Sequence, residues 1–513
     1  MRKHQSVKVS TGSLVFVLGL ALLGCRNRSS SEIKDIEGIG DIRFTVLQLN
    51  DLYEVLPVEG GKRGGLARVA TLRRQLLAEN PFTFTVLSGD FLSPSAIGAT
   101  AVDGAPIAGK HMMAVLNSLG VDVATYGNHE FDLTETQLKE RIAESEFDWT
   151  SSNVTQADGT LFPKETQRDL KVVTNSNQVS ARVAFVGVTI DMTRKPYVKY
   201  LDPVDSVKEQ VAAAKADGAD VVIALTHLNL ADDRVLADKV PDVAILMGGH
   251  EHEGIKTSQG ERNVPITKSE ANAKSVYVHR FAFNTATKAI TIDSKLVPID
   301  STIPEEESTA AVVNAWRDKA FLAMKQAGFE PAKIIATAQV GLDGYESSIR
   351  NRPTNLCQAL AKGFLLEVPQ ADVALFNSGT VRIDDLIPPG KITQFDVLRM
   401  FPFGGKLHLV TMTGDILKAV IEQGQVNKGS GGYLQFANVT AGTSPGQWLV
   451  KGAPLLPAQS YKVVLNDFMM TGQEKGLSYL NYADGKIQKI SESRDIRTAI
   501  AENMPAALGQ LGL

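Results

Sequence analysis

From about residue 42 to residue 299, short apolar segments alternate with segments of helical periodicity. The apolar segments are rich in valine, isoleucine and phenylalanine, and each ends in a polar or glycine-containing turn. The predicted strands occupy residues 42–49, 82–87, 121–126, 181–188, 220–226 and 242–249. Strands that alternate with helices are typical of an α/β domain, so we predict this class for residues 41–300.

The helical segments organise the rest of the chain. Residues 66–77 place their leucine, valine and alanine side chains on related helical faces. Residues 301–328 carry one proline and three glutamates near their start and end at Gly328, which are the signals of a helix start and stop. We interpret this segment as a connecting helix that leads into a second α/β domain over residues 329–513. A chain of 513 residues also exceeds what one compact core holds.

The first 25 residues have the pattern of an export signal. Arg2, Lys3 and Lys8 precede an apolar run over residues 13–23, which is too short to span a membrane. The run ends in LLGC, which resembles a bacterial lipobox with Cys25 as the lipidated residue. Residues 26–40 are small and polar and indicate a tether. We expect a periplasmic or cell-surface lipoprotein anchored at Cys25, with a plain secretory signal as the alternative.

Composition and charge limit the partners of the protein. The hydrophobic content of 43% and the charged content of 21% are ordinary for a globular protein. The net charge of −4 gives no electrostatic attraction for a nucleic-acid polymer. We therefore expect a small-molecule partner and membrane contact through the N-terminal lipid only, and we infer no protein partner. Besides Cys25, the only cysteine is Cys357, which we interpret as a small buried apolar residue.

Five of the predicted strands end at residues that can bind a metal ion. These residues are Asp51, Asp90, Asn128 with His129, His227, and His250 with His252. Any one of them could simply cap a helix or form a turn. In open α/β folds, however, ligands gather at the carboxyl ends of strands. The repetition of the pattern at five strand ends therefore favours a metal site.

The residue types indicate a binuclear centre. A carboxylate such as Asp90 can bridge two cations, while imidazoles and a carboxamide oxygen complete shells suited to Zn, Mn or Fe. Two such ions, roughly 3.5–4 Å apart, acidify a shared water and neutralise phosphoryl oxygens, so that the resulting hydroxide can attack a phosphate ester. His129 and Asp132 are three residues apart and would share a helical face. Asp132 could then orient His129 to stabilise the phosphoryl group and assist the leaving group.

The motifs NDLY, GDFLS, GNHEFD, THL and GGHEH resemble the 5'-nucleotidase family of calcineurin-like binuclear metallophosphatases. The resemblance covers nearly the whole chain after the signal. It implies an N-terminal αββα metallophosphatase domain and a C-terminal α/β substrate-binding domain. It also implies one metal held by Asp51, Asp90 and His252, and a catalytic dyad of His129 and Asp132. The second metal would be held by Asp90, Asn128, His227 and His250.

The resemblance also implies a nucleotide site in the C-terminal domain. SIRNRPTN supplies Arg350 and Arg352, and NSGTVR supplies Asn377 and Arg382. The arginines would contact the phosphate in a bidentate manner, although surface salt bridges are the common alternative. PFGGKL and VTMTGDIL follow, as in the family.

Two tyrosines are the candidates to hold the base. GGYLQF places Tyr433 at a stacking position, with a core aromatic as the alternative. In TGQEKGLSYL, Leu477 stands where the family has an aromatic, which leaves either Tyr479 or a single ring to hold the base.

Tyr53 departs from the pattern, because a histidine is expected two residues after Asp51. We interpret Tyr53 as a residue that lines the first metal site without binding the ion, so that this site is weaker or differently selective. Direct binding of its phenolate to a ferric ion is a second interpretation. The predicted function is hydrolysis of nucleotide 5'-monophosphates. The alternatives are a 2',3'-cyclic-nucleotide 2'-phosphodiesterase with 3'-nucleotidase activity and a non-catalytic nucleotide-binding lipoprotein.

Overall fold

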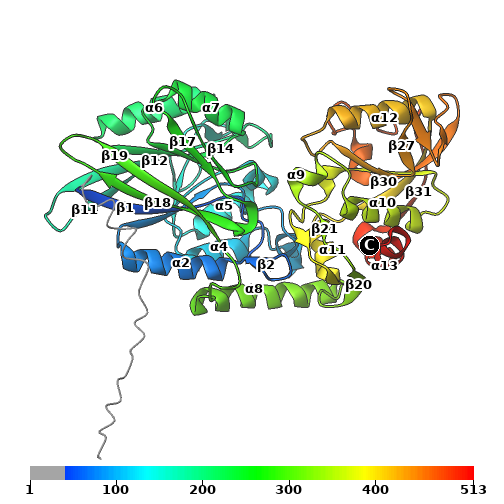
Figure 1. Ribbon diagram of the computed structural model, residues 1–513, viewed down its shortest axis with the longest axis horizontal. Helices are drawn as coiled ribbons and strands as arrows, with labels where there is room; N and C mark the ends of the chain where they lie inside the picture. The colour runs from blue at the N-terminus through cyan, green and yellow to red at the C-terminus, as the bar shows by residue number, and fades with distance from the viewer. Residues whose placement is uncertain (1–40, 484) are drawn as a thin grey trace, which may run out of the picture.

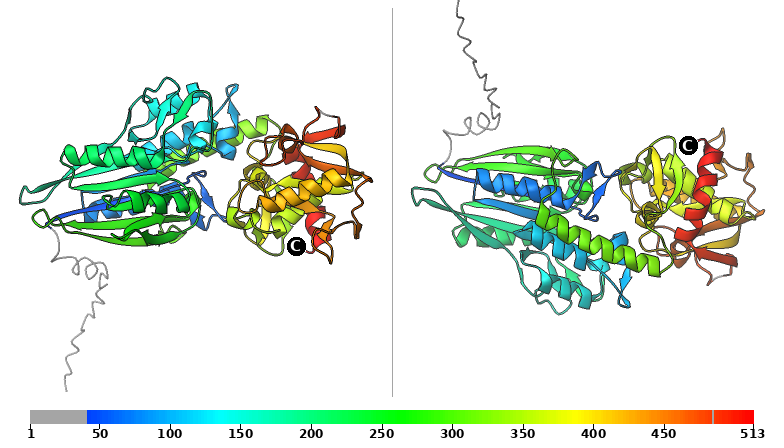
Figure 2. Two further views of the ribbon diagram at one scale, coloured as in Figure 1. Left: turned by 90° about the horizontal axis from the view of Figure 1, so that it is seen from above. Right: turned by 90° about the horizontal axis from the view of Figure 1, so that it is seen from below.

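The computed structural model describes residues 41–483 and 485–513, and it forms two domains side by side (Figure 1). The predicted signal peptide, the lipobox and the tether lie outside the described residues. Helix α8 (Glu307–Gln326) runs along the N-terminal domain and leads to the C-terminal domain (Figure 2). The predicted connecting helix is therefore present, but it begins at Glu307, because Glu306 caps it by accepting hydrogen bonds from the backbone N–H groups of Ser308 and Thr309.

Two sheets form the core of the N-terminal domain. The first has the order β10 (Glu165–Thr166), β8 (Asp148–Thr150), β7 (Val123–Thr125), β4 (Thr83–Ser88), β1 (Ile42–Leu49), β18 (Ser275–Phe283) and β19 (Ile290–Pro298). The second has the order β11 (Asp169–Thr174), β12 (Ser180–Thr189), β14 (Val221–His227), β15 (Ile245–Gly248), β17 (Val264–Lys268) and β16 (Ile255–Gln259). All six strands predicted for this domain are present, with ends shifted by a few residues.

The central strands of each sheet are parallel, and this positions the site. β1 pairs with β4 and β4 with β7 in parallel, as do β14 and β15 in the second sheet. The carboxyl ends of β1, β4 and β7 therefore share one edge, and those of β14 and β15 share another. Backbone and side-chain hydrogen bonds join the two edges, as from the Ser88 hydroxyl to the carbonyl of Met247.

The layers follow from where the apolar side chains point. Phe44, Val86, Ile223, Met247 and Phe281 pack together between the two sheets. Helices α2 (Leu66–Glu79), α4 (Lys110–Leu119) and α8 cover the first sheet, whereas α6 (Pro203–Ala216) and α7 (Leu230–Lys239) cover the second (Figure 1). This arrangement confirms the predicted αββα sandwich.

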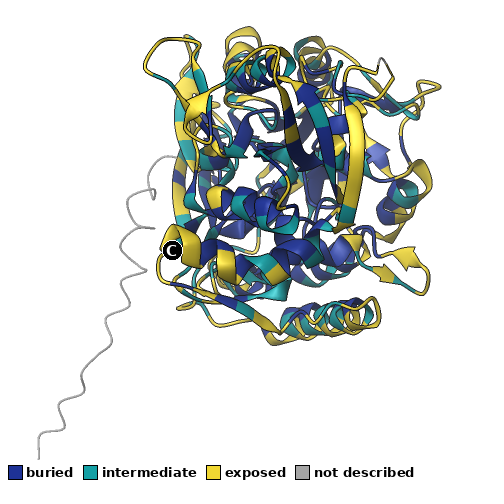
Figure 3. Ribbon diagram, turned by 90° about the vertical axis from the view of Figure 1, so that its right-hand side faces the viewer, coloured by how far each residue is buried: buried dark blue, intermediate teal, exposed yellow. Residues whose placement is uncertain are grey.

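The C-terminal domain is built on one five-stranded sheet. Its order is β26 (Leu434–Ala437), β22 (Val373–Asn377), β30 (Ser460–Asn466), β25 (Lys406–Thr413) and β31 (Gln488–Asp495). Helices α10 (Asn355–Glu367) and α13 (Ile496–Leu511) pack on one face, and α12 (Gly414–Val426) packs on the other. The interior strand β22 is fully buried, whereas the edge strand β31 is largely exposed, and Figure 3 shows this contrast between strands. Cys357 is buried in α10, as expected.

Within residues 41–483 and 485–513, no helix combines the length and the apolar character needed to cross a membrane. The helix that joins the domains, α8, is amphipathic. It buries Val313, Ala320 and Met324 against the N-terminal core and leaves charged residues on its other side.

Candidate metal centre and active site

The predicted metal-binding residues converge at the edges where the parallel strands end. Asp51, Asp90 and His227 bring donor atoms within 4.8 Å of one another, and all three residues are buried. Asp90 Oδ2 lies 3.1 Å from His227 Nε2, and Asp51 Oδ1 lies 3.3 Å from His252 Nε2. The backbone N–H of His250 donates to Asp51 Oδ2 at 2.9 Å. Residues from separate loops of both sheets therefore meet at one place.

Two buried polar atoms test whether these residues fit a metal ion. Asn128 Oδ1 and His227 Nε2 have no hydrogen-bond partner among the described residues. His227 Nδ1 lies 2.8 Å from the Ser88 carbonyl oxygen and must donate to it, which in the neutral ring leaves the lone pair of Nε2 facing an Asp90 oxygen. Buried acceptors that face each other are unfavourable unless a positive charge lies between them, which either a proton on His227 or a metal ion can supply. The residues present therefore fit a metal ion.

The electrostatics of the histidines show that the carboxylates attract positive charge. Burial lowers the pKa of His227, but the nearby Asp90 and Asp51 carboxylates outweigh burial and raise it to about 9. Burial, reinforced by the positive charge of His227, lowers the pKa of His250 to about 3. At physiological pH, without an ion, His250 is therefore neutral, whereas His227 carries a proton that it would release on binding a metal.

The backbone at the ligand loops is strained. Four of the six predicted metal ligands have a positive φ: Asp51 at 52°, Asp90 at 56°, His250 at 84° and His252 at 60°. Non-glycine residues rarely adopt this region, and such strain persists where the surroundings over-determine it, most often at functional sites. Gly127 is required beside Asp90, because a Cβ there would lie 2.2 Å from Asp90 Oδ1. The loops are therefore shaped to hold side chains in one arrangement.

Glu130 holds two of these loops together. Its fully buried carboxylate accepts hydrogen bonds from the backbone N–H groups of Asp90, Phe91, Leu92 and Gly127. Burial, with the charge of Asp90 adding to it, raises the pKa of Glu130 to about 7. The sequence analysis did not single out this residue. Its only signal was a charged residue beside a histidine, within the motif GNHEFD.

The predicted dyad is formed as its spacing requires. His129 and Asp132 lie on one turn, η1 (His129–Asp132), with His129 Nδ1 2.7 Å from Asp132 Oδ2. The Ser93 hydroxyl also donates to Asp132 Oδ2. The backbone N–H of His129 donates to Asp90 Oδ1 at 2.7 Å, which ties the dyad to the carboxylate of a predicted metal ligand.

Tyr53 lies among the ligands of the first predicted metal. Its hydroxyl is 3.0 Å from both Asp90 Oδ2 and His252 Nε2, and 3.5 Å from Asp51 Oδ1. Burial and the carboxylates of Asp90 and Asp51 raise the pKa of Tyr53 well above its ordinary value. The phenol is therefore neutral in this environment and donates to the carboxylates. This contact agrees with a residue that lines the site.

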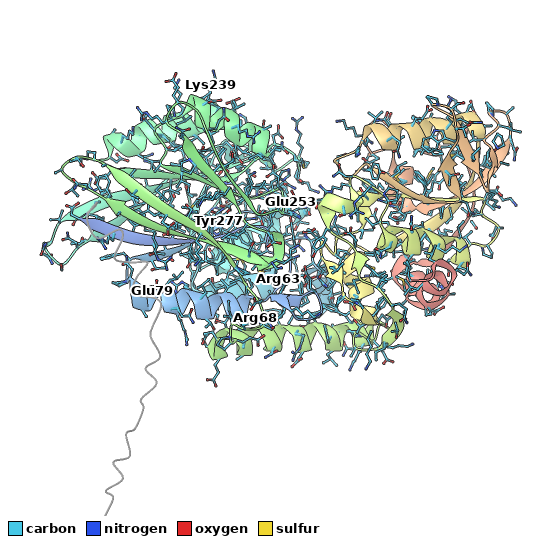
Figure 4. All side chains as sticks on the ribbon, viewed as in Figure 1. Arg63, Arg68, Glu79, Lys239, Glu253 and Tyr277 are labelled. Carbon is cyan, nitrogen blue, oxygen red and sulfur yellow. The ribbon has the colours of Figure 1, made fainter. Side chains whose placement is uncertain are left out.

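A cavity of about 1360 Å³ opens from the dyad into the C-terminal domain. His129 and Asp132 line its N-terminal side, and Asn377 and Arg382 line its C-terminal side. Arg382 Nη1 lies 3.5 Å from His129 Nε2, so the predicted phosphate-binding arginine reaches the dyad across the domain boundary. In Figure 4, Glu253 marks the end of the N-terminal domain that faces this boundary.

The other predicted substrate residues lie elsewhere. Arg350 pairs with Glu346 at 2.6 Å, and Arg352, 59% exposed, pairs with Asp343 at 2.7 Å. The described residues that line the cavity include none of Arg350, Arg352, Tyr433 and Tyr479. Tyr433 is only 4% exposed, and Tyr479 packs against an apolar cluster that also contains Leu477.

Two phenylalanines that the sequence analysis did not select line the cavity instead. Phe403 and Phe468 are 60% and 39% exposed. The Arg382 guanidinium lies 5.9 Å from the Phe403 ring centre. Phe403 belongs to the motif PFGGKL, so the signal was present, but nothing in one sequence distinguished its ring from other aromatics.

The comparisons with known proteins match both domains. Residues 44–254 match the model of the calcineurin-like phosphoesterase family, and residues 334–481 match that of the 5'-nucleotidase C-terminal domain. The chain is 27% identical over 485 residues to a 5'-nucleotidase of Bos taurus, covering 84% of this chain and 81% of that protein. It is 26% identical over 487 residues to the protein UshA of Yersinia enterocolitica, covering 84% of this chain and 85% of that protein.

Among solved structures, a 5'-nucleotidase precursor from Thermus thermophilus superposes with a TM-score of 0.74 at 24% identity, covering 91% of this chain and 96% of that one. This likeness supports the two-domain fold. Both family models and the sequence motifs then agree, and the chain combines a calcineurin-like phosphoesterase domain with a 5'-nucleotidase C-terminal domain.

Proposed function

We propose that the protein is a metal-dependent phosphoester hydrolase that acts on nucleotide 5'-monophosphates. The observation that carries this proposal is the position of the dyad, which lies between the metal-binding carboxylates and a cavity lined by Arg382 and two exposed aromatic rings. A site built in this way can hold a phosphate at one end and a flat base at the other.

Two divalent ions are expected, with Zn, Mn or Fe compatible with the donor types. One would be held by Asp51, Asp90 and His252, and the other by Asp90, Asn128, His227 and His250. When bound, such ions supply Lewis-acid neutralisation of phosphoryl oxygens and lower the pKa of a bound water.

The protein side chains supply the remaining chemistry. His129, held by Asp132 at 2.7 Å, is placed to stabilise the phosphoryl group and to give a proton to the leaving oxygen. The Arg382 guanidinium lies beside His129 and would bind the phosphate through charge-assisted hydrogen bonds. Phe403 and Phe468 offer faces on which a base can stack, and stacking tolerates any base.

A substrate panel tests this function. Purified protein supplied with Mn²⁺ or Zn²⁺ is assayed for phosphate release from AMP, 3'-AMP and cyclic 2',3'-AMP. We expect the highest kcat/KM with AMP. Preference for the cyclic ester or for 3'-AMP would assign the alternative phosphodiesterase function, and a protein that hydrolyses none of the three would contradict hydrolysis altogether.

The N-terminal segment supports a proposed location. We infer that export is followed by lipidation at Cys25, because a basic start, a short apolar run and LLGC occur in that order. Mass spectrometry of the mature N-terminus tests this inference. A diacylglyceryl-modified Cys25 is expected, and an unmodified N-terminus would contradict it.

A further inference from the structure

Asp384 connects the C-terminal domain to a metal ligand of the N-terminal domain. It lies in the segment that joins the turn η3 (Ser378–Thr380) to β23 (Leu386–Ile387), two residues after Arg382. Asp384 Oδ2 lies 3.0 Å from His252 Nδ1, and the Asp384 side chain is 8% exposed. The other nitrogen of the same ring, Nε2, faces Asp51 Oδ1 at 3.3 Å. One imidazole therefore joins the metal-binding carboxylate of one domain to a carboxylate of the other.

Both domains hold Asp384 in place. Its Oδ1 accepts a hydrogen bond from the backbone N–H of Glu346 at 2.7 Å. Its backbone oxygen accepts one from Lys274 Nζ at 2.9 Å, which comes from the N-terminal domain. Asp384 has a φ of 41°, a strained conformation that persists because these contacts fix it. The carboxylate is therefore presented to His252 in a defined orientation.

A buried ion network beside Asp384 fixes the position of the two domains. Arg399 of the C-terminal domain bonds through Nε to Glu54 at 2.9 Å and through Nη2 to Asp385 at 2.8 Å. Each of these three side chains is at most 8% exposed. Glu54 directly follows Tyr53, which itself contacts His252. These paired buried charges require one relative placement of Glu54 and Arg399, so they make the contact between the two domains specific.

We propose that Asp384 is a positioning residue for the first metal, so that this metal site is complete only when the C-terminal domain is docked. A histidine ligand binds a metal well when its second ring nitrogen donates to a carboxylate, because this fixes the tautomer and the ring orientation and makes the ligand more basic. In this protein that carboxylate belongs to the domain that carries the substrate cavity. The inference rests on the proposed function, because it assumes the metal centre described above.

The arrangement has a thermodynamic consequence. If docking strengthens the first metal site, then by linkage metal binding stabilises the docked arrangement by the same factor. The second predicted site, with Asn128, His227 and His250, receives no such carboxylate from the other domain in the contacts described above. The two sites should therefore respond differently to a change at Asp384.

The test is a titration of metal-free protein with Co²⁺, followed by visible absorption. Asp384→Asn is the main variant, because asparagine tolerates the left-handed backbone and keeps the size of the side chain. We expect one of the two Co²⁺ sites to weaken by about 10- to 100-fold and its spectrum to change, while the other site is unaffected. Equal weakening of both sites would indicate a general loss of stability and would contradict the proposed role of Asp384.

Tyr345→Phe is the matched control. It removes a hydrogen bond across the same boundary, from the Tyr345 hydroxyl to Glu59 Oε1 at 2.7 Å, without changing Asp384. Both Co²⁺ affinities should stay within about twofold of those of the wild type, because Tyr345 is not a predicted metal ligand and the substitution removes only one hydroxyl group. Circular dichroism of the metal-free variants confirms that each is folded.

The outcomes separate the two proposals. If the wild-type protein binds two Co²⁺ ions and the Asp384→Asn variant binds each of them as tightly as the wild type does, this inference is overturned and the proposed function stands. A wild-type protein that binds no divalent ion would overturn the proposed function and this inference with it.

Discussion

The predicted metal centre and the cavity proposed to hold the substrate are built in opposite ways. At the metal centre the side chains are buried, four ligands sit in a strained left-handed backbone, and Glu130 ties two of the loops together through four backbone N–H groups. The substrate cavity is wide, at about 1360 Å³, and two of its aromatic residues are exposed to solvent. The predicted metal centre holds each side chain in one position, whereas the cavity has space in which a ligand can bind.

This difference fits the tasks proposed for the two regions. Donors to a metal must be held within a few tenths of an ångström, which requires hydrogen bonds and packing around each donor. A base that stacks on a ring needs a flat surface and little else. Substitutions at the rigid region should therefore affect chemistry or metal binding, and substitutions at the open region should affect substrate binding.

The largest effect is expected for His129→Ala. Loss of a general acid or base lowers kcat by about 10²- to 10⁴-fold. Metal content should be unchanged, because the backbone N–H that bonds to Asp90 remains. Steady-state phosphate release with elemental analysis of the same sample checks both points. A kcat close to that of the wild type would show that the dyad has no role in the chemical step.

Substitution of Phe403 by alanine should act on KM instead. Stacking of a base on an aromatic ring contributes about 1–3 kcal/mol, so we expect KM for AMP to rise by about 5- to 150-fold with a smaller change in kcat. Tyr433→Leu and Tyr479→Leu serve as controls, because each removes an aromatic ring that does not line the cavity. A larger effect at Tyr433 than at Phe403 would return the base site to the position predicted from the sequence.

Tyr53→His tests how the first predicted metal ion is held. The phenol oxygen lies 3.0 Å from both Asp90 and His252, so an imidazole in place of the phenol would add a metal-binding nitrogen on this side of the site. The first metal should then bind about tenfold more tightly. Calorimetric titration with Mn²⁺ measures this affinity, with Tyr53→Phe as the control. If both variants lose metal, the phenol oxygen is itself a ligand.

The smallest effect on catalysis is expected for Glu165→Gln. Glu165 Oε2 accepts hydrogen bonds from the Phe162 N–H and the Tyr126 hydroxyl, near the loop that carries Asn128. Burial raises the pKa of Glu165 from 4.5 to about 8, so between these pH values the folded protein holds a proton that the unfolded chain has released. The free energy of unfolding should then fall by up to about 1.4 kcal/mol per pH unit as pH rises through this range.

Glutamine cannot titrate, so the Glu165→Gln variant should lose this contribution. Urea unfolding at several pH values between the two pKa values of Glu165 would show a shallower decline with pH for the variant than for the wild type. Equal slopes for the two proteins would mean that Glu165 is not protonated in the folded state.

The cluster of Asp51, Asp90 and His227 could be predicted from the sequence, because each of these residues lies at or just after the end of a strand of clear apolar pattern. Asp51 and Asp90 follow neighbouring parallel strands of the first sheet, and His227 ends a strand of the second sheet, so the packing of the two sheets brings the three side chains together. Asp384 could not be found in this way, because its role depends on how two domains meet. The exposure of the aromatic rings could not be predicted for a related reason: Phe403 and Tyr433 are both aromatics near glycines, and only tertiary packing buries one and exposes the other.

The most direct test of the account is to measure metal content and phosphate release on the same preparation. We predict two divalent ions per chain, loss of AMP hydrolysis when a chelator removes them, and recovery when both are restored. Full hydrolysis of AMP by protein that holds less than one ion per chain would contradict the metal centre on which the proposed function depends.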